Sequence, residues 1–272
     1  MPNNYNLPSY ILFLLAWLLT TTVAHANERI LALAPHICET LYAIGAGKDI
    51  VGGVSYCDYP AAAKDLPRIG AYNRINVEAA ISLKPTLAIA LNPQTPGLDK
   101  LRALGVKVVS SYPLTVDEVI SETRRLGKLT NHQQQANQVA DAMQKRLNRL
   151  KQRVSKQNIP VFYEIWADPL LTAGNNTFIH DVLKQIGLRN VFGSVALEAP
   201  RVNVESVINA KPKLIIIPSE KRDISVRSAY WRKWLGDDIA IITVNPDLVH
   251  RPGPRLLDGM EYLVNQIEGL DL

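Results

Sequence analysis

The sequence predicts an α/β protein of two similar lobes, each a parallel sheet flanked by helices, joined by one long rigid α-helix. Three observations support this fold. Short apolar runs alternate with helical segments, a pattern typical of parallel sheets covered on both faces. Residues 76–90 read NVEAAISLKPTLAIA and residues 203–217 read NVESVINAKPKLIII, with eight identical positions of fifteen. Between the two copies, residues 131–157 contain neither Gly nor Pro.

The first half of the chain alternates strands with helices. Gly45 and Gly105 each follow a helical segment, where a glycine commonly ends a helix. Pro85 ends another, because proline disfavours helical geometry in the residue before it. The expected strands are 29–34, 50–54, 87–91 and 106–110, and the expected helices are 39–44, 78–83 and 98–104.

The same pattern restarts near residue 159. Gly187 and Gly236 are the helix terminators here. Each copy of the repeated stretch falls on a helix-to-strand unit, so we expect the two halves to fold alike. The expected strands are 160–166, 214–217 and 239–244, and the expected helices are 177–186, 204–210, 228–235 and 256–267.

The stretch between the halves predicts a single amphipathic helix. Its apolar residues recur at spacings of three and four, and at 1.5 Å per residue a helix of this length would extend roughly 40 Å. We therefore expect an N-terminal lobe over 27–130, an interlobe helix over 131–157 and a C-terminal lobe over 158–272. A cleft between lobes held apart in this way is the natural ligand site. The apolar stripe comprises Ala136, Val139, Ala140, Met143, Leu147, Leu150 and Val154.

The N-terminus predicts a signal peptide over residues 1–26. The apolar run Ile11–Leu19 is shorter than the roughly 20 residues of a membrane-spanning helix, and Ala24-His25-Ala26 fits a signal-peptidase site. No Lys or Arg precedes the run, and a buried N-terminal helix is the alternative interpretation. Cleavage near Ala26 would release a soluble protein into the periplasm.

Composition narrows the classes of function. The formal net charge of +5 is dispersed, and the basic stretch 145–156 lacks interleaved aromatic residues, so it indicates a solvated helix face rather than a nucleic-acid site. We find no paired acid–base or nucleophile motif and no metal-ligand spacing, and we expect neither an enzyme nor a metal site. Cys38 and Cys57 would lie in an oxidising compartment, which favours a disulfide bond over two buried thiols.

Each copy of the repeat begins with Asn-Val-Glu. Asn76 and Asn203 suit helix N-caps, and Glu78 and Glu205 complement the positive ends of those helices. Capping alone does not explain why both halves use the same pair of residues. In a second interpretation, each glutamate projects from its lobe towards a partner that is itself a symmetric dimer.

Three segments resemble a known family. These are VGGVSYCDYP (51–60), RIGAYNRINVEAAISLKPTLAIA (68–90) and HRPGPRLLDGMEYL (250–263). They are similar to the class III, helical-backbone periplasmic substrate-binding proteins that supply importers of cobalamin, haem and ferric siderophores, and to the cobalamin-binding branch in particular. The resemblance covers essentially the whole mature chain. It implies a monomer that carries a corrinoid, cobalamin above all, as its transported ligand to an ABC importer, with Glu78 and Glu205 docking on arginines of the membrane permease dimer.

The resemblance also implies a ligand site in the cleft. Tyr56 matches a tyrosine that packs on the ligand, and Asp247 and Arg251 match a polar pair that contacts its amide side chains. Tyr72 stands where a family member has tryptophan, and the positions of Leu91, Leu171 and Ala199 are aromatic in that relative. Trp166 is expected either to compensate for these lost aromatics or to belong to the core. The candidate ligand-binding residues are Tyr56, Tyr72, Leu91, Trp166, Leu171, Ala199, Asp247 and Arg251.

Two alternatives remain open. The missing aromatics favour a haem- or ferric-siderophore-binding protein of the same architecture. His36 and His250, each after a strand, would then be candidate axial ligands to iron or cobalt, with surface positions as the plainer interpretation. The more distant alternative is an exported α/β enzyme that acts from the cleft.

Overall fold

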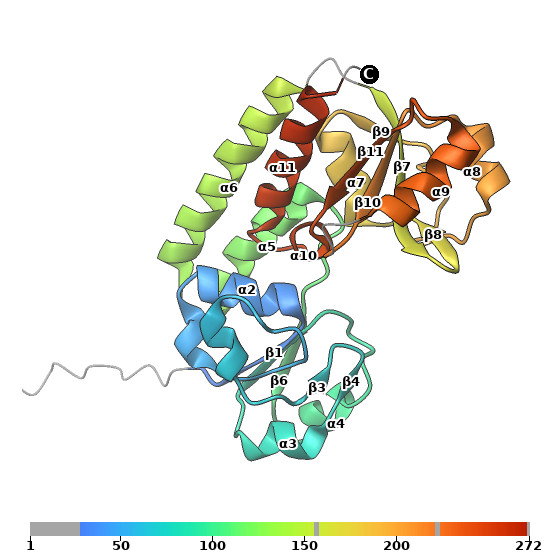
Figure 1. Cartoon of the computed structure of the whole chain (residues 1–272). Helices are drawn as coiled ribbons and strands as arrows, with labels where there is room; N and C mark the ends of the chain where they lie inside the picture. The colour runs from blue at the N-terminus through green and yellow to red at the C-terminus, as the bar shows by residue number, and fades with distance from the viewer. Residues whose placement is uncertain (1–27, 155–157, 221–223, 271–272) are drawn as a thin grey trace, which may run out of the picture.

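The computed structural model describes residues 28–154, 158–220 and 224–270, and the predicted signal segment 1–26 lies outside them (Figure 1). Two α/β lobes lie one above the other in this view, and a pair of helices runs beside the C-terminal lobe and ends at the N-terminal lobe. In the part of the chain that the structure describes, no helix is both long enough and apolar enough to span a bilayer.

The N-terminal lobe contains a four-stranded parallel sheet in the order β2-β1-β5-β6. Its strands are β1 (Ile30–Leu33), β2 (Ile50–Gly53), β5 (Leu87–Ala90) and β6 (Lys107–Ser110). Its other elements are α2 (Pro35–Ala43), α3 (Val77–Ser82), α4 (Leu98–Ala103), two 3₁₀ turns (Ala46–Asp49 and Ala61–Asp65) and the short β3 (Gly70–Ala71) and β4 (Arg74–Ile75). The helix α2 begins four residues before the expected start at 39, because Pro35 occupies the first turn, where its missing N–H is not needed.

The C-terminal lobe contains a parallel sheet in the order β11-β10-β7-β9, with β8 antiparallel to β7. Its strands are β7 (Ile159–Ala167), β8 (Leu170–Thr172), β9 (Leu188–Asn190), β10 (Leu214–Pro218) and β11 (Ala240–Val244). Its helices are α7 (Phe178–Gln185), α8 (Val204–Ala210), α9 (Ser225–Leu235), α10 (Pro246–Val249) and α11 (Leu256–Glu268).

The two lobes are built on one plan. The order β2-β1-β5-β6 corresponds strand for strand to β9-β7-β10-β11, and the repeated stretch forms α3 and β5 in one lobe and α8 and β10 in the other. Asn76 and Asn203 cap their helices through their side chains. Lys84 and Lys211 end them with the same positive φ of 48°. The repeat therefore encodes one helix-to-strand unit, used twice.

The connection between the lobes is a helical hairpin. The helix α6 (Gln133–Arg153) is preceded by α5 (Val116–Leu129), which sequence reasoning missed, and the two pack together beside α11 (Figure 1). Most of the apolar stripe of α6 lies in the core of the C-terminal lobe. Leu126 and Ala136, at the tip of the hairpin, belong to the core of the N-terminal lobe. Most of the hairpin therefore packs in the core of the C-terminal lobe, and its tip packs in the core of the N-terminal lobe.

Ion pairs attach α6 to α11 along its length. The Arg146 guanidinium contacts Asp258 at 2.7 Å and Glu261 at 2.5 Å, and Arg153 contacts Glu268 at 2.5 Å. These side chains are partly exposed, so each pair contributes modestly. The buried apolar stripe accounts for most of the rigidity of the connection.

Candidate ligand-binding cleft

Two adjacent cavities lie between the lobes, with volumes of ≈ 340 Å³ and ≈ 440 Å³. Residues that follow β1, β5 and β6 line the smaller cavity together with residues from the C-terminal lobe. This is the carboxyl-terminal edge of a parallel sheet, where open α/β proteins bind ligands. Four residues line both cavities, namely Tyr72, Leu91, Tyr112 and Glu198.

Four of the eight residues expected to bind ligand line these cavities. They are Tyr72, Leu91, Ala199 and Arg251. Tyr56 does not, and its side chain is 69% exposed. Trp166 is 62% exposed and lines a separate hollow on the C-terminal lobe, so it is not a core residue. Its indole Nε1 donates to the carbonyl of Asp168 at 2.8 Å.

The other two expected residues do not line these cavities either. Leu171 is half-buried on β8, where it forms an isolated bridge with Arg201. Asp247 lies in the first turn of α10, where its backbone N–H donates to the side chain of Asn245 at 2.9 Å. The Asp247 carboxylate pairs with Arg251 at 2.6 Å.

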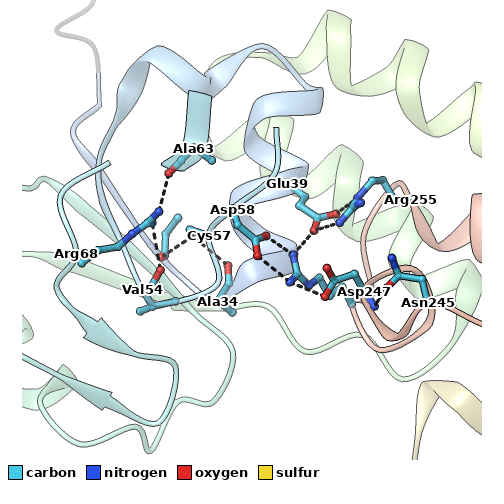
Figure 2. Close-up of polar contacts among 12 residues, drawn as sticks. Ala34, Glu39, Val54, Cys57, Asp58, Ala63, Arg68, Asn245, Asp247 and Arg255 are labelled. Carbon is cyan, nitrogen blue, oxygen red and sulfur yellow. Dashed lines mark hydrogen bonds and ion pairs between the residues drawn. The ribbon is translucent and has the colours of Figure 1, made fainter. Parts of the chain in front are cut away.

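A cluster of charged groups joins the two lobes beside the cleft (Figure 2). Arg251 contacts Glu39 of α2 at 2.8 Å and Asp58 at 2.7 Å, in addition to Asp247. Arg255 forms a two-pronged pair with Glu39 at 2.8 and 2.7 Å. Burial raises the pKa of the Asp58 carboxyl, but the hydrogen bond and charge of Arg251 outweigh burial and leave that pKa below its usual value. The positive charge of Arg251 is therefore compensated within the protein.

Two histidines face the smaller cavity in their neutral form. Burial lowers the pKa of His36 and of His250 to about 4 in each case. The His36 ring donates from Nε2 to the Ser111 carbonyl at 3.3 Å, and His250 Nε2 lies 3.0 Å from the Tyr163 hydroxyl. Both side chains are cleft residues rather than surface residues.

The disulfide expected between Cys38 and Cys57 is absent, and both residues are buried free thiols. They are neighbours in the core of the N-terminal lobe. The hydrogen bond to Cys57 and then burial raise the pKa of the Cys38 thiol. Cys57 also approaches the Ala32 carbonyl at 3.8 Å. The prediction from compartment alone was wrong for this structure, because the pair is accommodated by packing and hydrogen bonds without a covalent link.

Sequence reasoning missed several residues that line the cleft. Tyr112, Pro113 and Leu114 follow β6 and lead into the overlooked α5. Their position just after a strand was a usable signal, since that edge of the sheet binds ligands. Glu198 had no comparable signal, because the loop between β9 and α8 reaches the cleft only through tertiary packing. Within the described ranges, no group of three or more His, Cys, Asp or Glu side chains could hold a metal ion.

Glu78 and Glu205 occupy equivalent exposed positions. Each lies in the first turn of its helix, α3 or α8, just after the capping asparagine. The helix α3 is at the end of the N-terminal lobe remote from its partner lobe, and α8 is at the outer side of the C-terminal lobe, away from α6 (Figure 1). Neither residue lines the interlobe cavities.

The two α/β lobes share one strand order, the hairpin of α5 and α6 connects them, and residues of both lobes line the cleft. Together these features define a solute-binding protein. Residues 30–228 match the family model described as periplasmic binding protein. The chain belongs to this family.

The names of individual relatives state a ligand, which the description of the family does not. A vitamin B12-binding protein of Yersinia pseudotuberculosis is 33% identical over 98% of this chain and 95% of its own length. The vitamin B12-binding protein of Yersinia pestis is also 33% identical, over 93% of this chain and 90% of its own. The crystal structure of the periplasmic vitamin B12-binding protein BtuF of Vibrio cholerae matches with a TM-score of 0.80 and 30% identity, covering 89% of this chain and 96% of that one. The haem-binding protein BhuT shares the fold at a TM-score of 0.80 with 19% identity, over 89% and 98% of the two chains.

Proposed function

We propose that this protein captures a corrinoid, cobalamin above all, in the interlobe cleft in the periplasm and delivers it to an ABC importer. The observation that carries the proposal is a cleft lined by both lobes at the sheet edge, in a chain with 33% identity to vitamin B12-binding proteins along nearly its whole length. Tyr72, Leu91 and Ala199 line the space. They are available for apolar contact with a large ring.

Binding rather than catalysis suits the groups in the cleft. The neutral histidines hydrogen-bond to protein atoms, and Arg251 is held by carboxylates. The cleft thus offers a surface for capture, and membership of a family of binding proteins supports the same conclusion.

Delivery would use one glutamate from each lobe. Glu78 and Glu205 have equivalent local structures, because the repeat places each in the first turn of a capped helix. A pair of equivalent acidic groups suits a permease dimer that presents the same basic patch twice. The hairpin of α5 and α6 and the charged cluster beside the cleft would keep the two glutamates at a nearly constant spacing. The protein would act as a monomer.

Titration of the purified mature protein with cyanocobalamin tests the assignment. We expect saturable one-to-one binding by calorimetry and a bound corrin spectrum after gel filtration. The same titration with haemin examines the second candidate, which the two cleft histidines favour, since neutral imidazole is a haem ligand. Tight haemin binding with a Soret band, and no heat with cyanocobalamin, would replace the corrinoid assignment.

A further inference from the structure

A hydrogen bond crosses the cleft between Tyr112 and Glu198. Tyr112 follows β6 of the N-terminal lobe, and Glu198 lies in the segment between β9 and α8 of the other lobe. The phenol donates to Glu198 Oε1 at 2.5 Å. Burial and this hydrogen bond raise the pKa of Tyr112 to about 12, so the phenol keeps its proton. Because both residues line both cavities, the carboxylate is part of the wall that the two cavities share.

The backbone of Glu198 is fixed. Its carbonyl accepts from the Gly174 N–H at 3.0 Å, and the Asn175 N–H donates to the Val195 carbonyl at 2.9 Å. A Cβ on Gly174 would lie only 2.0 Å from the Leu197 carbonyl oxygen, which shows how closely the two segments approach. The carboxylate is therefore carried by a rigid part of the lobe, as a recognition group needs to be.

The cleft has little positive charge to offset Glu198. Among the described residues that line the two cavities, only Glu198 and Arg251 carry a charge, since His36 and His250 are neutral. Arg251 already contacts three carboxylates, and its cluster contains three carboxylates against two guanidinium groups. Glu198 faces a neutral phenol. A ligand in the cleft is consequently exposed to negative charge that the protein does not offset.

We propose that Glu198 determines specificity by accepting hydrogen bonds from carboxamide N–H groups at the rim of the ligand and disfavouring rims that carry carboxylates. This inference rests on the proposed function and names the chemistry that the cleft selects. A carboxamide donates a charge-assisted hydrogen bond to a carboxylate. A ligand carboxylate at the same place has no proton to donate at neutral pH and is repelled. Amide-edged corrins would be accepted, whereas tetrapyrroles with propionate edges would be rejected.

Matched ligands test this selection. Cyanocobalamin is compared with its purified monocarboxylate derivatives, in each of which one peripheral carboxamide is hydrolysed to a carboxylate. We expect at least one derivative to bind wild-type protein about 10-fold or more weakly than cyanocobalamin. In Glu198→Gln, that ratio should shrink by about 10-fold, because the neutral amide both donates and accepts. Asp238→Asn, at an exposed site away from the cleft, changes the net charge equally and should leave the ratio unchanged.

Tyr112→Phe distinguishes recognition of the ligand by Glu198 from a purely structural role of the hydrogen bond between Tyr112 and Glu198. It removes the cross-cleft bond but keeps the carboxylate, so discrimination against the carboxylate derivative should remain within about 3-fold of wild type. Thermal unfolding confirms that each variant is folded. Equal discrimination by wild type and Glu198→Gln would overturn the proposal. So would loss of discrimination in Tyr112→Phe to the same extent as in Glu198→Gln, which would make the pair a structural brace.

Haemin separates this inference from the proposed function. If wild-type protein fails to bind cyanocobalamin, the corrinoid assignment fails, and the role of Glu198 is then read from haemin alone. Tighter haemin binding by Glu198→Gln than by wild type, by about 5-fold or more, would uphold selection against carboxylates. Unchanged haemin affinity in that case would overturn it.

Discussion

At the scale of single residues, His36 and His250 show how burial sets a charge state in the cleft. Each imidazole is largely buried beside the smaller cavity and forms a hydrogen bond, to a carbonyl for His36 and to the Tyr163 hydroxyl for His250. Burial disfavours the imidazolium form in both. The result is a pair of neutral donors and acceptors beside the ligand at neutral pH.

This charge state predicts a loss of stability on acidification. The folded pKa of about 4 for each histidine lies below the ordinary 6.5, so the unfolded chain binds protons first as pH falls. The free energy of unfolding should therefore decrease between about pH 6.5 and pH 4, by about 3 kcal/mol for each histidine at the low end. Urea unfolding at about pH 7 and about pH 4.5 measures the change.

A variant of His250 shows whether this histidine causes the loss of stability on acidification. His250→Gln keeps a polar side chain but cannot titrate, so the free energy of unfolding of this variant should fall less with acidification than that of wild type. The depressed pKa of Asp58 does not interfere, because its contribution is lost only below the ordinary pKa of a carboxyl group. An identical pH dependence in wild type and variant would show that His250 is not the titrating group.

At the scale of elements, the hairpin of α5 and α6 depends on close helix contact at one glycine. A Cβ added to Gly127 of α5 would lie 2.1 Å from the Cβ of Ala136 of α6. Real side chains do not approach so closely, so the two small residues set the spacing of the helices where they enter the N-terminal lobe. The charged pairs of α6 with α11 are exposed by comparison and contribute less.

Gly127→Ala should therefore destabilise the protein by about 2 kcal/mol, although alanine is the better helix former. The double variant Gly127→Ala with Ala136→Gly moves the methyl group to the other helix and should recover part of the loss. Urea unfolding of the three proteins gives the comparison. A more stable Gly127→Ala would mean that helix propensity outweighs the contact and that the helices separate at little cost.

At the scale of the whole molecule, two connections hold the lobes together besides the hydrogen bond between Tyr112 and Glu198. One is the hairpin, whose tip inserts Leu126 and Ala136 into the N-terminal core. The other is the charged cluster, in which Arg251 and Arg255 of the C-terminal lobe form ion pairs with Glu39 of the N-terminal lobe. Breaking a buried pair of this kind leaves a charge without a partner, which is strongly unfavourable. The lobes should consequently move little when ligand binds, and the spacing of Glu78 and Glu205 should persist.

Delivery can be tested apart from capture. In a strain of the source bacterium that lacks this gene, Glu78→Arg with Glu205→Arg should abolish growth on limiting cobalamin, because like charges would meet at the permease. The purified variant should still bind cyanocobalamin as wild type does, since neither residue lines the cleft. Asp238→Arg is the control for reversal of a surface charge. Normal growth of the double variant would remove these glutamates from docking.

Local patterns in the sequence determined most of the fold. Alternating apolar runs located the principal strands of both sheets, and the stripe from Ala136 to Val154 indicated α6, because burial on one face imposes a period that can be read along the chain. The repeat located the equivalent units of the two lobes. The helix α5 was missed because its ends carry neither a glycine nor a proline signal, although Thr115 caps its start.

Only the tertiary structure decided which side chains share the cleft. Glu198 and Tyr112 are 86 residues apart, and the pairing of Arg251 with Glu39 spans 212 positions. Such contacts depend on how the lobes close around the hairpin, and no periodicity records that. The state of Cys38 and Cys57 was decided in the same way, by packing and hydrogen bonds in the core rather than by compartment. The sequence by itself determined the lobes and their repeated unit, because those follow from local burial; the folded chain decided the charge and shape of the site, because those arise between distant segments.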